Sequence, residues 1–276
     1  QYITMTKIIS ILNEKGGVGK TTTTSSLGSI LASRGFKVVM LDLDPQADLT
    51  LACKKADEAT NIYDILFETK KVTGVNVNPN LVLIPGSSKM AATKFKTKIQ
   101  DEYSLMHPIT VLKSVFKSLL VREDIHFVLI DCPPNLDLVV QNALAMSTHV
   151  LIPIVAHSFA VNGAWSIVDF IKKFRESDIN PELAPVGVLM NSFDQRLNIH
   201  RGVYELCLES FPNLMFNTKI RVNTKLAENT HLGQEIVTYA KELADGKFPN
   251  KFSGFEDFTQ LTDELLDRLG QKELAI

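Results

Sequence analysis

The sequence has little cysteine and no long apolar run, and these two shortages exclude several classes of protein. Its three cysteines, Cys53, Cys132 and Cys207, lie far apart and do not form pairs. This spacing argues against a disulfide framework and a zinc site, and it favours reduced thiols in the cytoplasm. No apolar stretch approaches the roughly 20 residues that span a bilayer, and the first residues lack the pattern of a signal peptide. We therefore expect a cytoplasmic protein without a membrane anchor.

The chain also lacks an excess of charge. It has 29 Lys and Arg against 31 Asp and Glu, a formal net charge of −2, so any nucleic-acid binding must use a local basic patch. It has no Pro-, Gly- or Ser-rich linker and no internal repeat. At 276 residues it is long enough for one large core. These features predict a single domain over residues 1–276. Met5 has the form of a natural start, so residues 1–4 are expected to be an addition.

A glycine-rich loop near the start of the chain is the strongest motif. The run EKGGVGKTT covers residues 14–22, after an apolar strand at 8–12 and before a helix at 23–33. Glycines let a backbone approach an anion closely, and the following helix points its N–H groups at the same place. In such a loop Lys20 reaches the β- and γ-phosphates, and the Thr21 hydroxyl ligates Mg²⁺.

Acidic and amide side chains follow three further predicted strands. Asp42 and Asp44 end the run 38–43, Asp131 ends 126–131, and Asn191 follows 186–190. Mg²⁺ keeps most of its water, so Asp131 is expected to hold it through a water molecule. The regular alternation of strands and helices predicts a doubly wound, mostly parallel sheet with helices on both faces, as in P-loop NTPases. Such a sheet brings the carboxyl ends of its strands, and these side chains, to one edge.

The loop has Glu14 in place of the first glycine of the ordinary pattern, and a second lysine, Lys15, follows it. The run KGGVGKTT resembles the deviant Walker A loop of the ParA/MinD family of P-loop ATPases. Further runs resemble family motifs: DLDPQ at 42–46, DCPP at 131–134, and the segment after 186–190. The resemblance extends from Lys7 to about Leu269. The small, Soj-like or short plasmid type is the most similar, because the loop leaves no room for an N-terminal helix-turn-helix domain.

The resemblance implies roles for individual residues. Lys15 reaches across an ATP-dependent homodimer to the partner's phosphates, Asp44 positions the attacking water, and Asp42 supports the Mg²⁺ shell. Asn191 and Arg221 contact adenine. The remaining contacts with ATP are implied along the loop, at Lys15, Gly16, Gly17, Val18, Gly19, Lys20, Thr21 and Thr22.

The function implied is a ParA-type ATPase that segregates plasmid or chromosomal DNA. Its dimer binds DNA without sequence preference on the nucleoid, and a ParB-like partner stimulates hydrolysis. The residues expected to contact DNA are basic positions of the C-terminal half, with Arg196 and Lys225 matching best: Arg196, Arg201, Lys219, Lys225, Lys247 and Lys251. A MinD-like positioning regulator is the alternative, although the acidic face of the last helix differs from a basic membrane anchor. An iron–sulfur electron donor and a dethiobiotin synthetase-like ligase are less favoured, because the cysteines lack a cluster-ligating context and Lys15 is present.

Overall fold

A computed structural model of the protein describes residues 6–54, 60–69, 71–120, 122, 124–247 and 252–270. The expectation for residues 1–4 lies outside this part of the chain. The described strands form one eight-stranded sheet in the order β3-β4-β2-β5-β1-β6-β7-β8, in which only the edge strand β3 runs antiparallel to its neighbour. The strands are β1 Lys7–Ile11, β2 Val38–Asp42, β3 Val75–Asn78, β4 Leu81–Ile84, β5 Phe127–Asp131, β6 His149–Val155, β7 Ala184–Phe193 and β8 Met215–Arg221.

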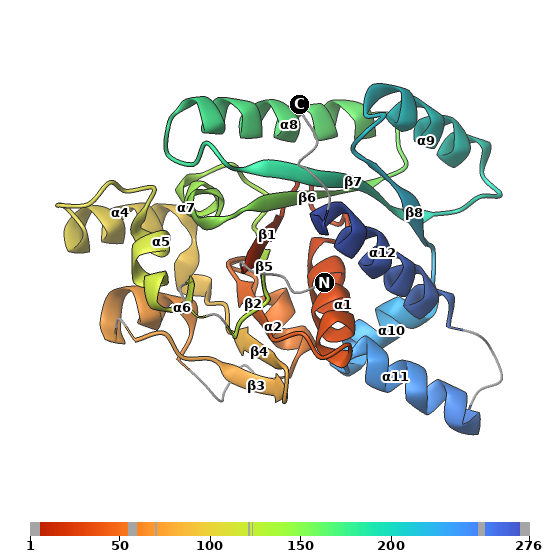
Figure 1. Ribbon diagram of the computed structural model, residues 1–276, viewed down its shortest axis with the longest axis horizontal. Helices are drawn as coiled ribbons and strands as arrows, with labels where there is room; N and C mark the ends of the chain where they lie inside the picture. The colour runs from red at the N-terminus through yellow and green to blue at the C-terminus, as the bar shows by residue number, and fades with distance from the viewer. Residues whose placement is uncertain are drawn as a thin grey trace.

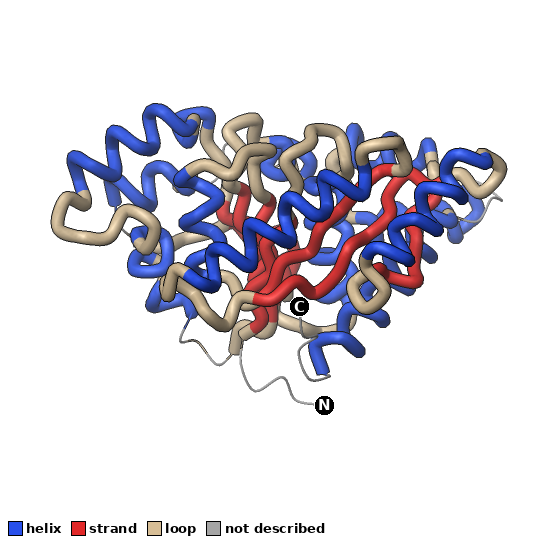
Figure 2. Tube along the Cα trace, turned by 90° about the horizontal axis from the view of Figure 1, so that it is seen from above, coloured by secondary structure: helices blue, strands red, loops and turns tan. Residues whose placement is uncertain are grey.

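Helices cover both faces of this sheet (Figure 1). Figure 2, seen from above, shows the strands lying between them. The α-helices are α1 Lys20–Ser33, α2 Asp48–Ala52, α3 Ile62–Asp64, α4 Ala92–Glu102, α5 Val111–Val115, α6 Lys117–Leu120, α7 Leu138–Met146, α8 Ala160–Glu176, α9 Asn198–Ser210, α10 Thr224–Leu232, α11 Ile236–Glu242 and α12 Ser253–Gly270. Within the described residues, no helix is both long enough and apolar enough to cross a bilayer.

The two faces have separate apolar cores because successive side chains of a strand point to opposite sides. In β1, Ile9 and Ile11 pack with α1, α11 and α12, whereas Ile8 packs with α7, α8 and α9. All five residues of β2 and of β5 are buried, as expected for central parallel strands covered on both faces. The predicted fold class is therefore confirmed.

Two local predictions were wrong. Pro108 can open a helix, and the sequence predicts that it runs to Leu120, but α5 begins at Val111 and the chain breaks at Phe116 before α6. Phe116 is fully buried, and the break lets it enter the core. Apolar residues at three- and four-residue steps from Val161 to Phe174 predict a core stripe that includes Trp165. Trp165 is instead 46% exposed and packs against Phe211 with ring centroids 4.8 Å apart.

Arg268 is one of the side chains that join the C-terminal helix α12 to the sheet. Arg268 donates hydrogen bonds to the carbonyl oxygens of Val186, Leu214 and Met215, and it pairs with Glu264 of its own helix at 2.9 Å. Its guanidinium also lies 4.0 Å from the centre of the Phe216 ring. The side chain is only 14% exposed. If it were removed, these carbonyl groups would lose a partner that water cannot easily replace.

We expect Arg268→Met to lower the free energy of unfolding by about 3 kcal/mol, because it removes a partly buried, charged donor while keeping the apolar stem. Urea denaturation measures this change. Arg122 forms an exposed pair with Asp124 and serves as the control. Arg122→Met should change the stability by less than about 0.5 kcal/mol, and equal effects of the two substitutions would refute the role of Arg268.

Candidate functional site

The glycine loop leaves β1 at the carboxyl edge of the sheet and leads directly into α1. Asn13 fixes its start, because its Nδ2 donates to the Pro153 carbonyl of β6 at 2.7 Å and its Oδ1 accepts from the Lys15 N–H at 2.9 Å. Gly17 and Gly19 have φ angles of 71° and 86°, a conformation that glycine adopts without strain. A Cβ at Gly19 would also stand 2.6 Å from Nδ2 of Asn191. The loop therefore requires glycine at position 19 for two reasons.

Lys20 is the basic group of the site. Its side chain is largely buried in the first turn of α1, and its Nζ donates to the Lys15 carbonyl at 3.1 Å. Burial lowers the pKa of Lys20, and the nearby carboxylates of Asp131 and Asp44 oppose that shift. An ammonium held in this way is suited to accept an anion, which would replace the solvation that it has lost.

Thr21 and Asp131 form the pair that suits a metal ion. The Thr21 hydroxyl donates to Oδ2 of Asp131 at 2.7 Å, and Asp131 is almost fully buried. Its Oδ1 has no hydrogen-bond partner among the described residues. Burial raises the pKa of Asp131 well above its usual range, and the neighbouring Asp42 adds to the shift. A hydroxyl beside a partly unsatisfied carboxylate is a donor set that fits Mg²⁺.

The two aspartates after β2 have different environments. Asp42 is fully buried and accepts hydrogen bonds from the N–H of Asp44 and from both the N–H and the hydroxyl of Thr50. Burial raises its pKa to about 6. Asp44 lines a large cavity beside the glycine loop, and its Oδ1 accepts from the Gln46 N–H at 2.9 Å. Asp42 therefore braces the loop behind the site, whereas Asp44 faces it.

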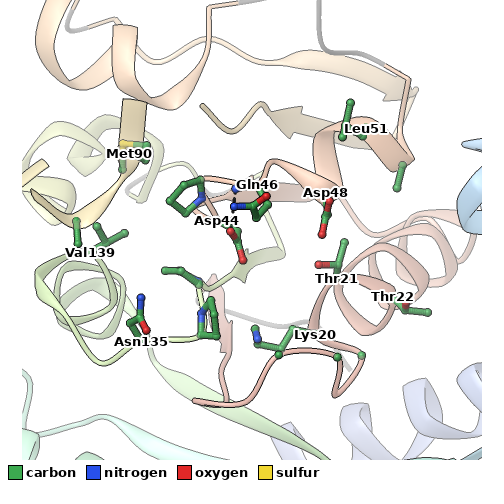
Figure 3. Close-up of a pocket in the computed structure, with 18 of the residues that line it drawn as sticks. Lys20, Thr21, Thr22, Asp44, Gln46, Asp48, Leu51, Met90, Asn135 and Val139 are labelled. Atoms are coloured by element: carbon green, nitrogen blue, oxygen red, sulfur yellow. Dashed lines mark hydrogen bonds between the residues drawn. The ribbon is translucent and has the colours of Figure 1, made fainter. Parts of the chain in front are cut away.

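The cavity has a volume of about 840 Å³. Figure 3 shows Lys20 and Asp44 pointing into it from different elements, with Met90 and Val139 along another wall. Most of the expected loop contacts line it, namely Gly16, Gly17, Gly19, Lys20, Thr21 and Thr22.

The chain after Asp131 closes one side of the cavity with Pro133, Pro134, Asn135 and Asp137. Sequence reasoning did not assign Met90, Asn135 or Val139 to the site, because nothing in their local sequence marks them.

A second hollow of about 270 Å³ lies on the other side of the loop. Gly17, Gly19 and Thr22 line both spaces, so the loop separates them. Asn191 enters this hollow: its Nδ2 donates to the Val18 carbonyl at 2.7 Å, and its buried Oδ1 has no partner among the described residues.

Arg221 lines the same hollow, but its guanidinium is held by another side chain. Its Nε and Nη2 donate to the Asp257 carboxylate, with a shortest distance of 2.6 Å. These hydrogen bonds raise its pKa. Asp257 could not be assigned to the site from local sequence, because it lies on α12, 36 positions away from Arg221.

The basic residues expected to contact DNA gather only in part. Arg196, Arg201 and Lys219 lie on the segment from the end of β7 to β8. Nη2 of Arg196 pairs with Oδ2 of Asp194 at 2.7 Å, and Nζ of Lys219 lies 4.0 Å from the centre of the Tyr204 ring. Lys225 is in α10. The Lys247 side chain and Lys251 lie outside the described residues.

Comparisons with known proteins identify the family. The family model AAA_31, described as an AAA domain, matches residues 6–185. The sporulation initiation inhibitor protein Soj of Bacillus subtilis (strain 168) is 33% identical over 242 residues, which are 85% of this chain and 92% of that protein. The chromosome-partitioning ATPase Soj of Treponema pallidum (strain Nichols) is 30% identical over 271 residues, 97% and 100% of the two chains. Among solved structures, a putative plasmid partition protein of Borrelia burgdorferi B31 bound to AMPPNP has a TM-score of 0.73 and 25% identity, and the match covers 96% of this chain and 98% of that one.

The fold and the glycine loop thus define a P-loop ATPase. The chain belongs to the ParA/MinD family of these enzymes. The family predicted from the loop and strand-end motifs is confirmed. The roles of the individual site residues stay predictions.

We expect Gly19→Ala to lower the free energy of unfolding by about 2 kcal/mol, since it places a side chain at a left-handed φ and displaces Asn191. Gly16 is the matched control, because a Cβ there would meet nothing within 4 Å. Urea denaturation should show that Gly16→Ala stays within about 0.5 kcal/mol of the wild type. A Gly19→Ala protein as stable as Gly16→Ala would contradict the loop geometry.

Proposed function

We propose that this chain is a ParA-type ATPase for DNA segregation, which binds Mg²⁺ and ATP, dimerises around the nucleotide and binds DNA without sequence preference. A ParB-like partner would stimulate hydrolysis. One observation carries the proposal: two lysines of one loop point to different places. Lys20 lines the large cavity, whereas Lys15 lines neither hollow. This division suits one lysine that serves its own nucleotide and one that serves a partner's.

The site residues fit a nucleotide that crosses the loop. Lys20 and the loop N–H groups would hold the phosphates in the large cavity. The free Oδ1 of Asn191 is an acceptor suited to the amino group of adenine in the smaller hollow. Arg221 would border the base and owes its fixed position to Asp257.

Thr21 and Asp131 would hold Mg²⁺, which supplies positive charge beside the phosphates when it is bound. Asp44 faces the cavity and would orient a water molecule by accepting a hydrogen bond from it. Asp42 already accepts hydrogen bonds from Asp44 and Thr50, so its contribution would be to hold the turn that presents Asp44.

A second copy of the chain is the occupant that fits the open side of the large cavity. The rim includes Leu51, an apolar side chain that is 60% exposed, together with Pro133 and Pro134. Docking of a second copy would cover this apolar rim. It would also bring the partner's Lys15 towards the phosphates, where a cation stabilises the charge of the transition state.

Binding to DNA would depend on the dimer, because the chain has a net charge of −2. The basic residues near β7, α9 and β8 give one small patch per protomer. Two protomers double the phosphate contacts. Each contact steepens the slope of the logarithm of the affinity against the logarithm of the salt concentration by about 0.9. Arg201 is the residue of this patch best placed to contact a DNA phosphate, because its side chain is exposed. Hydrogen bonds to the Gln195 carbonyl and the Asn198 side chain hold it in place.

We expect Lys20→Ala to weaken ATP binding by about a hundredfold, because the phosphates lose a charged donor. Lys15→Ala is the matched control in the same loop, and its monomer should bind ATP within about threefold of the wild type because Lys15 lies outside the cavity. Titration calorimetry with Mg–ATP measures both affinities. An affinity of Lys20→Ala within threefold of the wild type would remove Lys20 from the phosphate site.

DNA binding is tested by fluorescence anisotropy on two unrelated duplexes over a range of salt concentrations. We expect binding with ATP but not with ADP, equal affinity for both duplexes and a steep loss with salt. Arg201→Gln should weaken it, whereas Arg122→Gln, a change at an exposed ion pair preceding β5, should not. Equal affinity with and without nucleotide, or no binding at low salt, would favour a positioning regulator that does not use the nucleoid.

A further inference from the structure

The side chain of Lys15 lies along the first turn of α8. Its Nζ is 5.5 Å from the centre of the Phe159 ring. Its Cε is 3.8 Å from the place that a Cβ on Gly163 would occupy. Position 163 thus leaves room for the lysine to lie flat against the helix. The ammonium is directed to α8 rather than to the cavity that Lys20 lines.

The side chains of the two residues before Lys15 are bonded to the same region. The Ser166 hydroxyl, one turn further along α8, donates to Oε2 of Glu14 at 2.7 Å. Asn13 is bonded to Pro153 of β6, the strand that leads to α8. These contacts hold residues 13–15 against the β6–α8 connection, so the position of Lys15 does not depend on its own flexible stem alone.

Phe159 is a large apolar side chain that is mostly exposed. It is 64% exposed and stands immediately before α8, where it supplies no side-chain cap to the helix. Phenylalanine exposed to this degree gains little from burial, but its ring face attracts a cation within about 6 Å. The Lys15 ammonium lies within this range of the Phe159 ring.

We propose that Phe159 is a positioning residue that holds the Lys15 ammonium away from its own nucleotide cavity until a second copy docks. This inference rests on the proposed function, in which Lys15 acts across the dimer. A cation–π contact at an exposed site shifts an equilibrium by about two- to fivefold. Each lysine must leave its ring when the dimer forms, so the resting contact opposes premature dimerisation by about that factor per protomer.

The contact itself is tested by NMR on the nucleotide-free monomer with isotope-labelled lysine. The signal that disappears in Lys15→Arg is the signal of Lys15. We expect its ε-methylene protons to be shifted upfield by the ring current of residue 159 in the wild type and in Phe159→Tyr. In Phe159→Leu, which keeps an apolar side chain but no ring, they should move to the position of a solvated lysine. An unshifted Lys15 signal in the wild type overturns the inference.

The release is tested by adding Mg²⁺ and a non-hydrolysable ATP analogue to the same samples. We expect the upfield shift to vanish as dimers form, and sedimentation to show that Phe159→Leu dimerises about four- to twenty-five-fold more tightly than the wild type, because two lysines are freed per dimer. Phe159→Tyr should resemble the wild type. Circular dichroism checks that both variants fold.

The outcomes separate this inference from the proposed function. Dimers that form while the upfield shift persists overturn the resting role of Phe159, since Lys15 would then act from its ring-bound position. Weaker dimerisation of Phe159→Leu also overturns it, because the ring would then favour the dimer. An upfield shift in the monomer that disappears in Phe159→Leu, without any nucleotide-dependent dimer, supports the contact and refutes the dimer of the proposed function.

Discussion

Three ionisable groups, Asp42, Asp131 and Lys20, are buried together at the carboxyl edge of the sheet. Asp42 and Asp131 are partners in register on the adjacent strands β2 and β5, so neither can move away from the other. Burial raises the pKa of both carboxyls and lowers that of the ammonium, which means that each charge is costly in its place. A site of this kind favours ligands that bring compensating charge, and a metal ion with phosphates brings charge of both signs.

The rest of the molecule keeps this cluster in place. The sheet order puts β5 between β1 and β2, so the glycine loop, the aspartates after β2 and Asp131 converge without long connections. Asp42 receives its hydrogen bonds from Thr50 and Asp44, and Asn191 approaches the loop so closely that position 19 has no space for a Cβ. The helices on both faces exclude water from the strands that carry these groups. The core thus holds charged groups at its edge, where the cavity lies.

Much of this arrangement could be predicted from the sequence. The glycine loop, the strand before it and the helix after it follow from local patterns. Asparagine is a common N-cap, and Asn61 caps α3 by accepting from the N–H groups of Tyr63 and Asp64. The short edge strand β3 was missed, because its four residues carry a bulged, half-exposed pattern. Arg268 and Asp257 were missed as well, since their partners are far away in the sequence. The contact between Lys15 and Phe159 was missed for the same reason. It joins segments more than a hundred positions apart, which the β6–α8 connection brings together.

The central claim is that the two lysines of one loop serve two different nucleotides. The most direct measurement is ATP hydrolysis by mixtures of Lys15→Ala and Asp44→Ala protomers, each of which should be inactive alone. In a mixed dimer, the site of the Lys15→Ala protomer keeps its own Asp44 and receives Lys15 from its partner. Half of the dimers in an equal mixture are mixed and each has one complete site, so the account predicts recovery of up to about a quarter of the wild-type turnover. No recovery at any ratio, with mixed dimers present in the same samples, would contradict it.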